Sequence, residues 1–306
     1  MSHLAFIGLG NMGGGMCANL VSSGHPVRAY DLNPEAVDQA VAAGATPALD
    51  IASAVAGCDV VITMLPAGKH VHSVYFGDQG VLAHAPRTAL LIDCSTISVG
   101  EARDAATRVQ AAGFDCLDAP VSGGVAAAQA GTLTFMVGGS EAAFERARVT
   151  LGSMGKNIFH AGRSGNGQAA KCANNMLLGI SMIATCEAFN LAEKLGLESQ
   201  TFFDIASKAS GQCWSMTAYC SAPGPVPSAP SNRQYEPGFA VAMMLKDLRL
   251  ARDAAAASGA PIPFGLAAHA RYQRLVRRRE LGPTMLNAYA YRPGKRPTIY
   301  HWSATC

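Results

Sequence analysis

Three glycines near the start of the chain have the spacing of a loop that holds phosphate groups. Gly8, Gly10 and Gly13 form the pattern Gly-x-Gly-x-x-Gly, with Asn11 and Met12 in its second gap. The first glycine permits a tight turn, the second lets the backbone approach a pyrophosphate, and the third lets a helix pack closely on a strand. A helix that begins at this loop presents unpaired N–H groups and its positive dipole end to the phosphates. The pattern predicts a dinucleotide site.

Asp31 is the acidic residue that such a site needs. It ends the next apolar run, roughly 20 residues beyond the glycines, where a carboxylate can accept hydrogen bonds from the adenine ribose. A carboxylate there would repel a 2′-phosphate, and no Arg directly follows it, so we expect NAD rather than NADP. The alternative is a structural turn with an unrelated Asp. The apolar run before the glycines and the helical pattern after them argue against that alternative.

Three further segments stand where apolar runs give way to polar or turn-forming residues. They are Thr63-Met64-Leu65-Pro66, Asp93-Cys94-Ser95-Thr96 and the stretch 118–124. Ligands of open parallel sheets sit beyond the carboxyl ends of the strands, so we expect the first two to line the cofactor site, with Thr96 as a hydroxyl donor. In the third, Ser122, Gly123 and Gly124 can present several N–H groups to one carboxylate. By spacing alone, all three segments are equally well explained as ordinary turns.

Lys171 and Asn175 are four residues apart in a long helical pattern, so they project from one face, about 6 Å apart along the axis. Their neighbours on that helix are mostly apolar. A lysine on a buried face must be paired, or its pKa must fall, and a desolvated lysine near neutrality is a workable general base for a hydroxyl proton. Alternatively, Lys171 lies at the solvated start of the helix. The residues alone do not decide between these two interpretations.

The elements that must position these residues alternate regularly in the first half of the chain. Short apolar runs predict strands at 4–9, 27–31, 60–65, 89–93, 114–119 and 132–137, and helical patterns lie at 11–23, 34–43, 69–75 and 99–112. Near-continuous apolar strands alternating with helices indicate a parallel sheet covered on both faces. We therefore expect an α/β fold with a doubly wound, parallel-sheet Rossmann domain over residues 1–163.

The second half reads as an all-α domain over residues 164–306. Helical patterns cover 168–195, 199–209, 238–258 and 263–279, and a proline-rich loop from Pro223 to Pro237 separates two of them. The apolar stretch 176–192 is interrupted by polar residues, so we interpret it as a buried helix rather than a membrane span. Within 238–258, Lys246 and Asp247 form a neighbour pair of the kind usually found at a surface.

The composition is that of an ordinary globular protein, with 49% hydrophobic and 15% charged residues among 306. A net charge of +3 is too small to indicate binding to nucleic acid or to a membrane surface. Five arginines gather in one short stretch, where a solvated helix face explains them better than phosphate binding. They are Arg271, Arg274, Arg277, Arg278 and Arg279.

Cysteine and histidine usage point to a reducing compartment and away from metal binding. The nine cysteines include no Cys-x-x-Cys pair, which indicates reduced thiols. His70 and His72 form a His-x-His pair that no Cys or carboxylate cluster joins, so we expect no metal. No signal or transit segment precedes the first apolar run, and we expect the cytoplasm, or the mitochondrial matrix in a eukaryote.

Seven segments match one known family in order and spacing. They are FIGLGNMG (6–13), TMLP (63–66), DCSTI (93–97), DAPVSGG (118–124), GNGQAAKCANNMLLGI (165–180), SGQCWS (210–215) and MLKDLRLA (244–251). Together they resemble the β-hydroxyacid dehydrogenase family, and within it the 3-hydroxyisobutyrate dehydrogenases. The resemblance covers about residues 4 to 275. The loops LPAGKHV (65–71) and DCSTIS (93–98) are nearest to the bacterial form.

The resemblance assigns roles that the residues alone leave open. It implies that Lys171 is the catalytic base and that Asn175 helps to hold the substrate. The segment Ser122–Gly124 would bind the substrate carboxylate. Leu65, Pro66 and Thr96 would contact NAD together with the glycine loop, Asp31 and Met64, and Lys246 would reach the cofactor from the helical domain.

The implied activity is the NAD-dependent oxidation of (S)-3-hydroxyisobutyrate to methylmalonate semialdehyde, a step of valine catabolism, by a homodimer or homotetramer. One rival is a related reductase of tartronate or succinate semialdehyde, and a second is a non-catalytic dinucleotide-binding module. Retention of Lys171 argues against the second rival, and Asp31 argues against NADPH-dependent forms of the first.

One region departs from the family's pattern. The family's usual Asp-Phe-Ser ending is replaced by Glu280-Leu281-Gly282-Pro283 and a tail that runs to Cys306. Residues 285–289 retain at most a remnant of the family's last helix. The departure puts the fit of the substrate and the assembly in question, but not cofactor binding.

Overall fold

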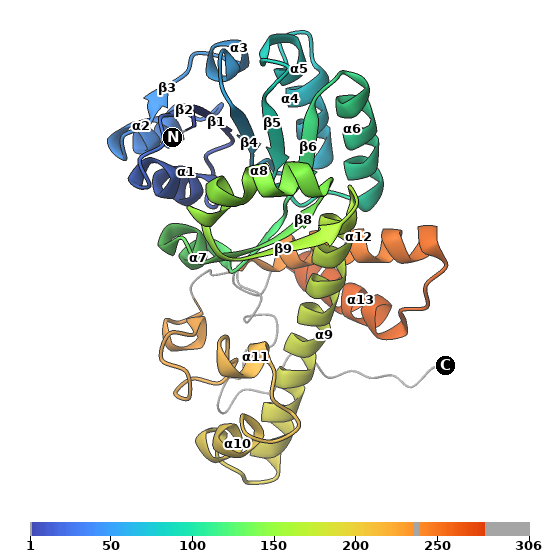
Figure 1. Ribbon diagram of the computed structural model, residues 1–306. Coiled ribbons are helices and arrows are strands. Elements are labelled where there is room, and N and C mark those ends of the chain that lie inside the picture. Colours follow the sequence, from blue (N-terminus) through green and yellow to red (C-terminus); the bar gives the residue numbers. More distant parts are fainter. Residues whose placement is uncertain (1, 236–238, 279–306) are drawn as a thin grey trace. The chain divides into compact units, whose positions relative to one another are not determined.

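The computed structural model describes residues 2–235 and 239–278 (Figure 1). The chain divides into two compact units, Met1–Lys171 and Cys172–Cys306. The expected domain boundary between residues 163 and 164 stays a prediction. The unusual C-terminus from residue 280, the remnant at 285–289 and Pro237 lie outside the described residues.

The first unit is built on one mixed sheet. Six of its strands are parallel in the order β3-β2-β1-β4-β5-β6, and β8 then pairs antiparallel with both β6 and β7 and parallel with β9. The strands are β1 (Leu4–Ile7), β2 (Val27–Tyr30), β3 (Thr46–Pro47), β4 (Val60–Thr63), β5 (Leu90–Asp93), β6 (Asp115–Asp118), β7 (Val121–Ser122), β8 (Leu133–Gly138) and β9 (Gly155–Gly162). The parallel part has the strand order of a doubly wound dinucleotide-binding fold.

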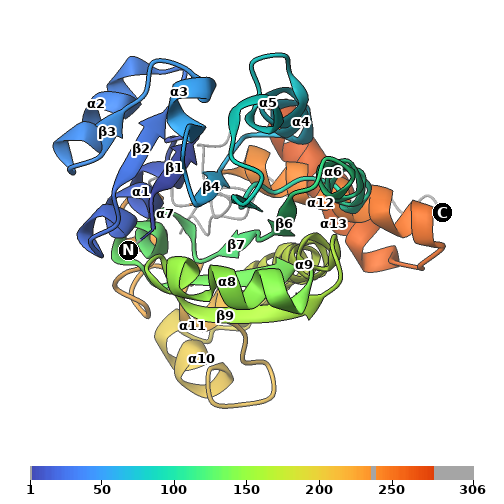
Figure 2. The same ribbon diagram turned by 45° about the horizontal axis from the view of Figure 1, so that its top comes forward.

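Helices cover both faces of this sheet, as Figure 2 shows for α1 and α2 on one side and α4 and α6 on the other. In β1, Leu4 and Phe6 join the core with the first group of helices, whereas Ala5 and Ile7 join the second. The first group is α1 (Gly13–Ser22), α2 (Pro34–Ala42), α7 (Gly124–Ala130) and α8 (Glu141–Gly152). The second is α3 (Ile51–Val55), α4 (Gly68–Phe76), α5 (Val81–His84) and α6 (Val99–Ala111). Burial on both faces explains why the central strands β1, β4 and β5 are mostly apolar along their whole length.

The expected fold class is confirmed, but the sheet is not parallel throughout. The run at 132–137 forms β8, which lies antiparallel to β6 and β7. Parallel neighbours need a crossover of about a dozen residues or more. The segment from Ser122 to Leu133 holds only the short helix α7, so the chain reverses direction instead.

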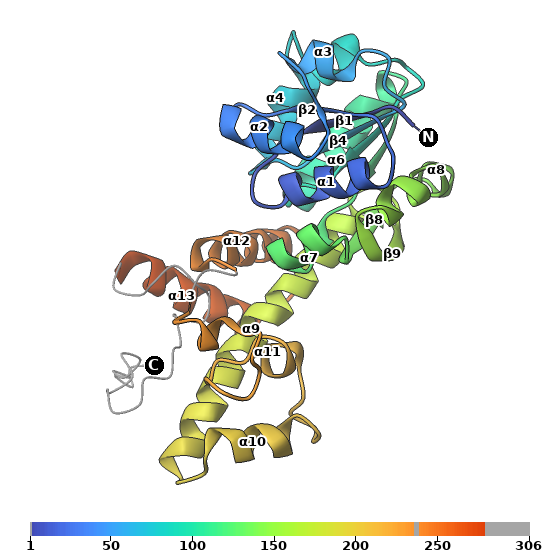
Figure 3. The ribbon, with the colours of Figure 1, turned by 90° about the vertical axis from the view of Figure 1, so that its left-hand side faces the viewer.

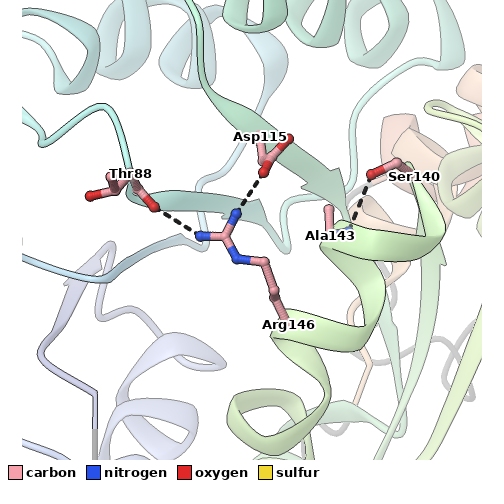
Figure 4. A network of polar contacts seen from close by, with 5 residues as sticks. All are labelled: Thr88, Asp115, Ser140, Ala143 and Arg146. Atoms are coloured by element: carbon pink, nitrogen blue, oxygen red, sulfur yellow. Dashed lines mark hydrogen bonds and ion pairs between the residues drawn. The ribbon is translucent and has the colours of Figure 1, made fainter.

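The antiparallel part is fastened to the parallel part through α8 (Figure 4). Ser140 caps this helix by accepting a hydrogen bond from the Ala143 N–H at 3.2 Å. One turn further on, the Arg146 guanidinium donates to the Asp115 carboxylate at 2.6 Å and to the Thr88 carbonyl at 2.8 Å. These contacts hold α8 against the amino ends of β5 and β6.

The described part of the second unit is helical, as expected. Figure 3 shows α10 and α11 beside the C-terminal part of α9, and α12 and α13 beside each other. The helices are α9 (Asn166–Lys194), which begins in the first unit, α10 (Ser199–Ala206), α11 (Trp214–Thr217), α12 (Val241–Ser258) and α13 (Pro263–Arg278). In the proline-rich loop, the only regular structure among the described residues is one 3-10 turn at Pro230–Asn232.

Helix α9 is only partly buried, which corrects the expectation of a buried helix. Met182 and Phe189 lie in two hydrophobic clusters, but Leu177 is 63% exposed and Leu191 60% exposed. Within the described residues, α9 is the one helix long and apolar enough to cross a membrane by length and composition, and 39% of its most apolar window is buried. An exposed apolar face therefore runs along part of this helix.

The eight cysteines that the structure describes are free, and six of them are buried. Burial raises the pKa of the Cys17 thiol to about 12 and the pKa of the Cys94 thiol well above its usual value. These buried thiols are therefore protonated and poorly reactive at neutral pH. Cys306 lies outside the described residues.

Candidate active site

The glycine loop joins β1 to α1 at the carboxyl edge of the sheet. Gly8 has φ +96°, and a Cβ there would lie 2.4 Å from the Met64 carbonyl oxygen. A Cβ at Gly13 would lie 1.9 Å from the Gly8 carbonyl oxygen, whereas one at Gly10 would meet no atom within 4 Å. The first and third glycines are thus required by the fold itself. The second leaves open space, which suits a pyrophosphate lying against the backbone.

Two further features of this loop fit a dinucleotide. Helix α1 begins without a side-chain cap at Met12, so no side chain there occupies the N–H groups that would face phosphate. Asp31, directly after β2, accepts hydrogen bonds from the Leu9 N–H at 2.6 Å and the Asn33 N–H at 2.8 Å. Both carboxylate oxygens retain lone pairs for a ribose. The residues present therefore fit NAD.

A buried polar network fixes the loops after β4 and β5. Asp93 accepts hydrogen bonds from the Thr63 hydroxyl at 2.8 Å and the Ser95 hydroxyl at 2.6 Å. The Ser95 hydroxyl in turn accepts the Leu65 N–H at 2.8 Å. These bonds hold the segments that contain Met64, Leu65, Pro66 and Thr96 side by side, and Thr96 itself is half-buried. No local pattern in the sequence indicates this structural role of Asp93 and Ser95.

The loop expected to bind a carboxylate lies beside the expected catalytic lysine. Lys171 is only 8% exposed, and its Nζ donates to the Val121 carbonyl at 2.7 Å. The alternative of a solvated lysine at the start of the helix is therefore wrong. Ser122 follows Val121 in β7, and Gly123 and Gly124 have φ +133° and +71°, conformations that L side chains rarely adopt.

A buried carboxylate anchors the start of the helix that carries Lys171. Asp118, at the end of β6, accepts the Gly165 N–H at 2.7 Å and the Gln168 N–H at 2.9 Å. Burial raises the pKa of the Asp118 carboxyl, and these two donors oppose that rise. A Cβ at Gly167 would lie 2.6 Å from the Asp118 carbonyl oxygen, so helix and strand meet backbone to backbone.

In the second unit, two neighbouring residues hold the Asn175 side chain. Its amide donates to the Asp247 carboxylate at 2.5 Å and its oxygen accepts from the Asn174 amide at 2.9 Å. Asp247 is only 4% exposed, so the expectation of a surface Lys-Asp pair is wrong for this residue. Lys246, its neighbour on α12, is half-buried.

The structure gathers most of the expected site within the first unit. The glycine loop, Asp31, the loops after β4 and β5, the Ser122–Gly124 segment and Lys171 all belong to it, whereas Asn175 and Lys246 belong to the second unit. Among the residues that the structure describes, no group of three or more His, Cys, Asp or Glu side chains is placed to hold a metal ion.

Comparison with known proteins places the chain among dehydrogenases. Residues 3–162 match the NAD-binding domain of 6-phosphogluconate dehydrogenase, and residues 165–288 match a domain described as NAD-binding of NADP-dependent 3-hydroxyisobutyrate dehydrogenase. A probable 3-hydroxyisobutyrate dehydrogenase of Mycobacterium tuberculosis is 51% identical over 87% of this chain and 89% of its own length. An NAD-dependent L-serine dehydrogenase of Pseudomonas aeruginosa is 47% identical over 90% and 93%.

A solved structure gives the same result. The chain is similar to M. tuberculosis 3-hydroxyisobutyrate dehydrogenase with L-serine, with a TM-score of 0.86 and 49% identity over 90% of this chain and 94% of that one. The fold and the dinucleotide loop define an NAD-dependent oxidoreductase. The chain belongs to the 3-hydroxyisobutyrate dehydrogenase family.

Proposed function

We propose that the protein oxidises (S)-3-hydroxyisobutyrate to methylmalonate semialdehyde with NAD, as a step of valine catabolism. The observation that carries the proposal is the buried Lys171 amine on the Val121 carbonyl, directly beside the Ser122–Gly124 loop. A base and a carboxylate-binding loop at neighbouring positions suit a small hydroxyacid. They also give Lys171 a task beyond packing.

In the proposed mechanism, Lys171 accepts the hydroxyl proton of the substrate. A neutral lysine amine that donates one hydrogen to the Val121 carbonyl keeps its lone pair for that proton. NAD, when bound, would accept the hydride from the substrate carbon that bears this hydroxyl group. Asn175, one helical turn beyond Lys171, orients the substrate through its amide, and the N–H groups of the Ser122–Gly124 loop hold the substrate carboxylate.

L-Serine is a second candidate substrate. One relative is named an NAD-dependent L-serine dehydrogenase, and one similar structure is described with L-serine. L-Serine and 3-hydroxyisobutyrate share a carboxylate and a primary alcohol. The carbon between these two groups carries an amino group in L-serine and a methyl group in 3-hydroxyisobutyrate. The same base and carboxylate loop would serve both, so the two substrates are separated only by the surroundings of that carbon.

A substrate panel with both cofactors tests the proposal. The panel contains both enantiomers of 3-hydroxyisobutyrate, L-serine, and tartronate and succinate semialdehydes in the reverse direction. We expect the highest kcat/KM for (S)-3-hydroxyisobutyrate, with a preference for NAD over NADP of about 100-fold, because Asp31 repels a 2′-phosphate. A higher kcat/KM for L-serine or a semialdehyde would replace the proposed substrate. Binding of NADH without turnover of any panel member would support a non-catalytic module.

We further propose that the protein is a cytoplasmic homodimer or homotetramer, or a mitochondrial matrix one if eukaryotic, assembled through its helical unit. Exposed apolar side chains on this unit support an interface there, among them Leu177 and Leu191 on α9 and Phe264, 75% exposed, on α13. Light scattering coupled to gel filtration should give a mass of two or four times 31.7 kDa. A monomer at micromolar concentration would contradict the assembly but not the activity.

Substitution of Asp247 by asparagine tests the contact that holds Asn175. Asparagine has nearly the same shape, but it replaces the charge-assisted bond of 2.5 Å between the Asn175 amide and the Asp247 carboxylate by a weaker one. We expect kcat/KM for the hydroxyacid to fall about 10- to 100-fold, because the Asn175 amide loses its fixed orientation. Steady-state kinetics measure this loss. Asp253→Asn, an exposed substitution on the same helix, is the control and should leave kcat/KM unchanged.

A further inference from the structure

Gln168 connects the helix that carries Lys171 to the loop that carries Thr96. Its side chain is buried, and its amide nitrogen donates to the Ser95 carbonyl at 2.7 Å. Its amide oxygen accepts the Ile97 N–H at 3.3 Å. The Gln168 amide thus satisfies one backbone acceptor and one backbone donor on either side of Thr96, as the backbone of a neighbouring strand would do.

The backbone of Gln168 is fixed as well. Its N–H donates to the Asp118 carboxylate at 2.9 Å, which ties the first turn of α9 to the end of β6. Lys171 follows three residues later, and its Nζ donates to the Val121 carbonyl at 2.7 Å. One helical turn therefore contacts three strands or their ends: the loop after β5, the end of β6 and strand β7.

We propose that Gln168 is a positioning residue that holds Lys171 in register with the Thr96 segment, and so sets the distance between the base and the bound nicotinamide. The proposal rests on the proposed function for its effect on catalysis. Asp118 fixes the position of α9 relative to the end of β6. Gln168 fixes the position of α9 relative to the segment 95–97, which contains Thr96.

The expected effect is on the chemical step and not on cofactor affinity. Most of the expected cofactor contacts come from the glycine loop and Asp31, and the hydrogen bonds of the Gln168 side chain go to neither of them. A displacement of a reacting group by about 1 Å can lower a rate about 100-fold. Loss of the Gln168 amide should therefore lower kcat and leave the Kd of NADH nearly unchanged.

Gln168→Met is the first test, because methionine has a similar length and shape but forms no comparable hydrogen bonds. We expect kcat to fall about 10- to 100-fold and the Kd of NADH to change less than about 3-fold. Hydrogen exchange in the cofactor-free protein should increase at residues 95–97 and at the start of α9 together, since one contact protects both.

Gln168→Glu gives a readout that a simple packing role would not give. A protonated carboxyl can donate to the Ser95 carbonyl and accept from the Ile97 N–H, as the amide does, whereas an ionised one has no donor and faces a carbonyl oxygen. Burial favours the neutral form. The ratio of this variant's kcat to the wild-type kcat should be close to one at the lowest pH of the assay and should fall as the pH rises. The same ratio for Gln168→Met should not depend on pH.

Asn166→Ala is the matched control, because Asn166 lies in the same turn and its amide donates to the Ala161 carbonyl at 2.9 Å, away from the cofactor loop. Wild-type kcat is expected for this control. A folded Gln168→Met protein with wild-type kcat, or equal losses of kcat in Gln168→Met and Asn166→Ala, would overturn the proposal. If the wild type oxidises no hydroxyacid, the proposed function fails, and the joint increase in hydrogen exchange still decides whether Gln168 couples the two segments.

Discussion

Substitution of Lys171 by alanine should lower kcat for the hydroxyacid by about 1,000-fold while NADH still binds. The expected loss is that of a general base, about 10²- to 10⁴-fold. Lys171 is buried and its amine donates to the Val121 carbonyl, so the alanine variant loses the amine that the proposed mechanism uses as the base. Steady-state kinetics measure kcat, and quenching of protein fluorescence by NADH measures the Kd.

Chemical rescue separates a catalytic role of Lys171 from a structural one. The alanine variant leaves a space of lysine's shape, so a small primary amine added to the assay should restore part of the activity. Lys171→Met fills that space with an apolar chain and should not be rescued. Lys156→Met, at an exposed lysine on β9, is the control and should keep full activity. A Lys171→Ala protein with near wild-type kcat would contradict the assignment of the base.

The centre of the parallel part of the sheet could be predicted because strands β1, β4 and β5 are buried on both faces. Leu4 to Ile7, for example, are all at most 2% exposed, so the run is continuously apolar and easily recognised. The strands β3 and β7 have only two residues each and give no such pattern. The direction of β8 depends on the length of its connection and not on its own residues.

The expected cofactor residues of the glycine loop and Asp31 could be recognised in the sequence because they lie close together in the chain. The glycine loop and Asp31 form one strand-turn-helix-strand unit, and the Asp31 carboxylate contacts the Leu9 N–H directly. The contacts around the expected catalytic residues bridge long separations instead, 73 residues between Gln168 and Ser95 and 72 between Asn175 and Asp247. A local pattern carries no sign of such partners.

Lys171 and Lys246 show where the residues alone stop being informative. The helical pattern left the burial of Lys171 undecided, and only the Val121 carbonyl and the surrounding sheet settle it. No local feature distinguished Lys246, whose role came from resemblance and stays a prediction. A Lys-Asp neighbour pair is typical of a surface, and Asp247 is buried because it pairs with Asn175 on another helix, a contact that the local pattern does not indicate.

Substitution of Gly10 by alanine should weaken NADH binding strongly without destabilising the fold, because the glycines of the loop differ in the space around them. In Gly10→Ala, the new Cβ meets no atom within 4 Å, so the free energy of unfolding should stay within about 0.5 kcal/mol of wild type. The same methyl group stands where a pyrophosphate must approach the backbone. We expect the Kd of NADH to rise at least about 30-fold, as measured by fluorescence titration.

Gly13→Ala should do the opposite and damage the fold first. Its Cβ would lie 1.9 Å from the Gly8 carbonyl oxygen, so helix α1 must move away from β1. Overpacking of this kind costs about 1–3 kcal/mol, which denaturant unfolding measures. Gly152→Ala, at the end of α8 with no atom within 4 Å of its Cβ, is the control and should change neither stability nor NADH binding.

The comparison of Gly10→Ala with Gly13→Ala separates a cofactor loop from a merely structural turn. Both interpretations predict that Gly13→Ala is unstable, because that contact belongs to the fold. Only the cofactor interpretation predicts a protein that is fully stable and yet binds NADH poorly, since nothing in the fold itself restricts Gly10. If Gly10→Ala bound NADH as tightly as the wild type, the pyrophosphate would have to lie elsewhere. The uncapped start of α1 would then have no assigned ligand.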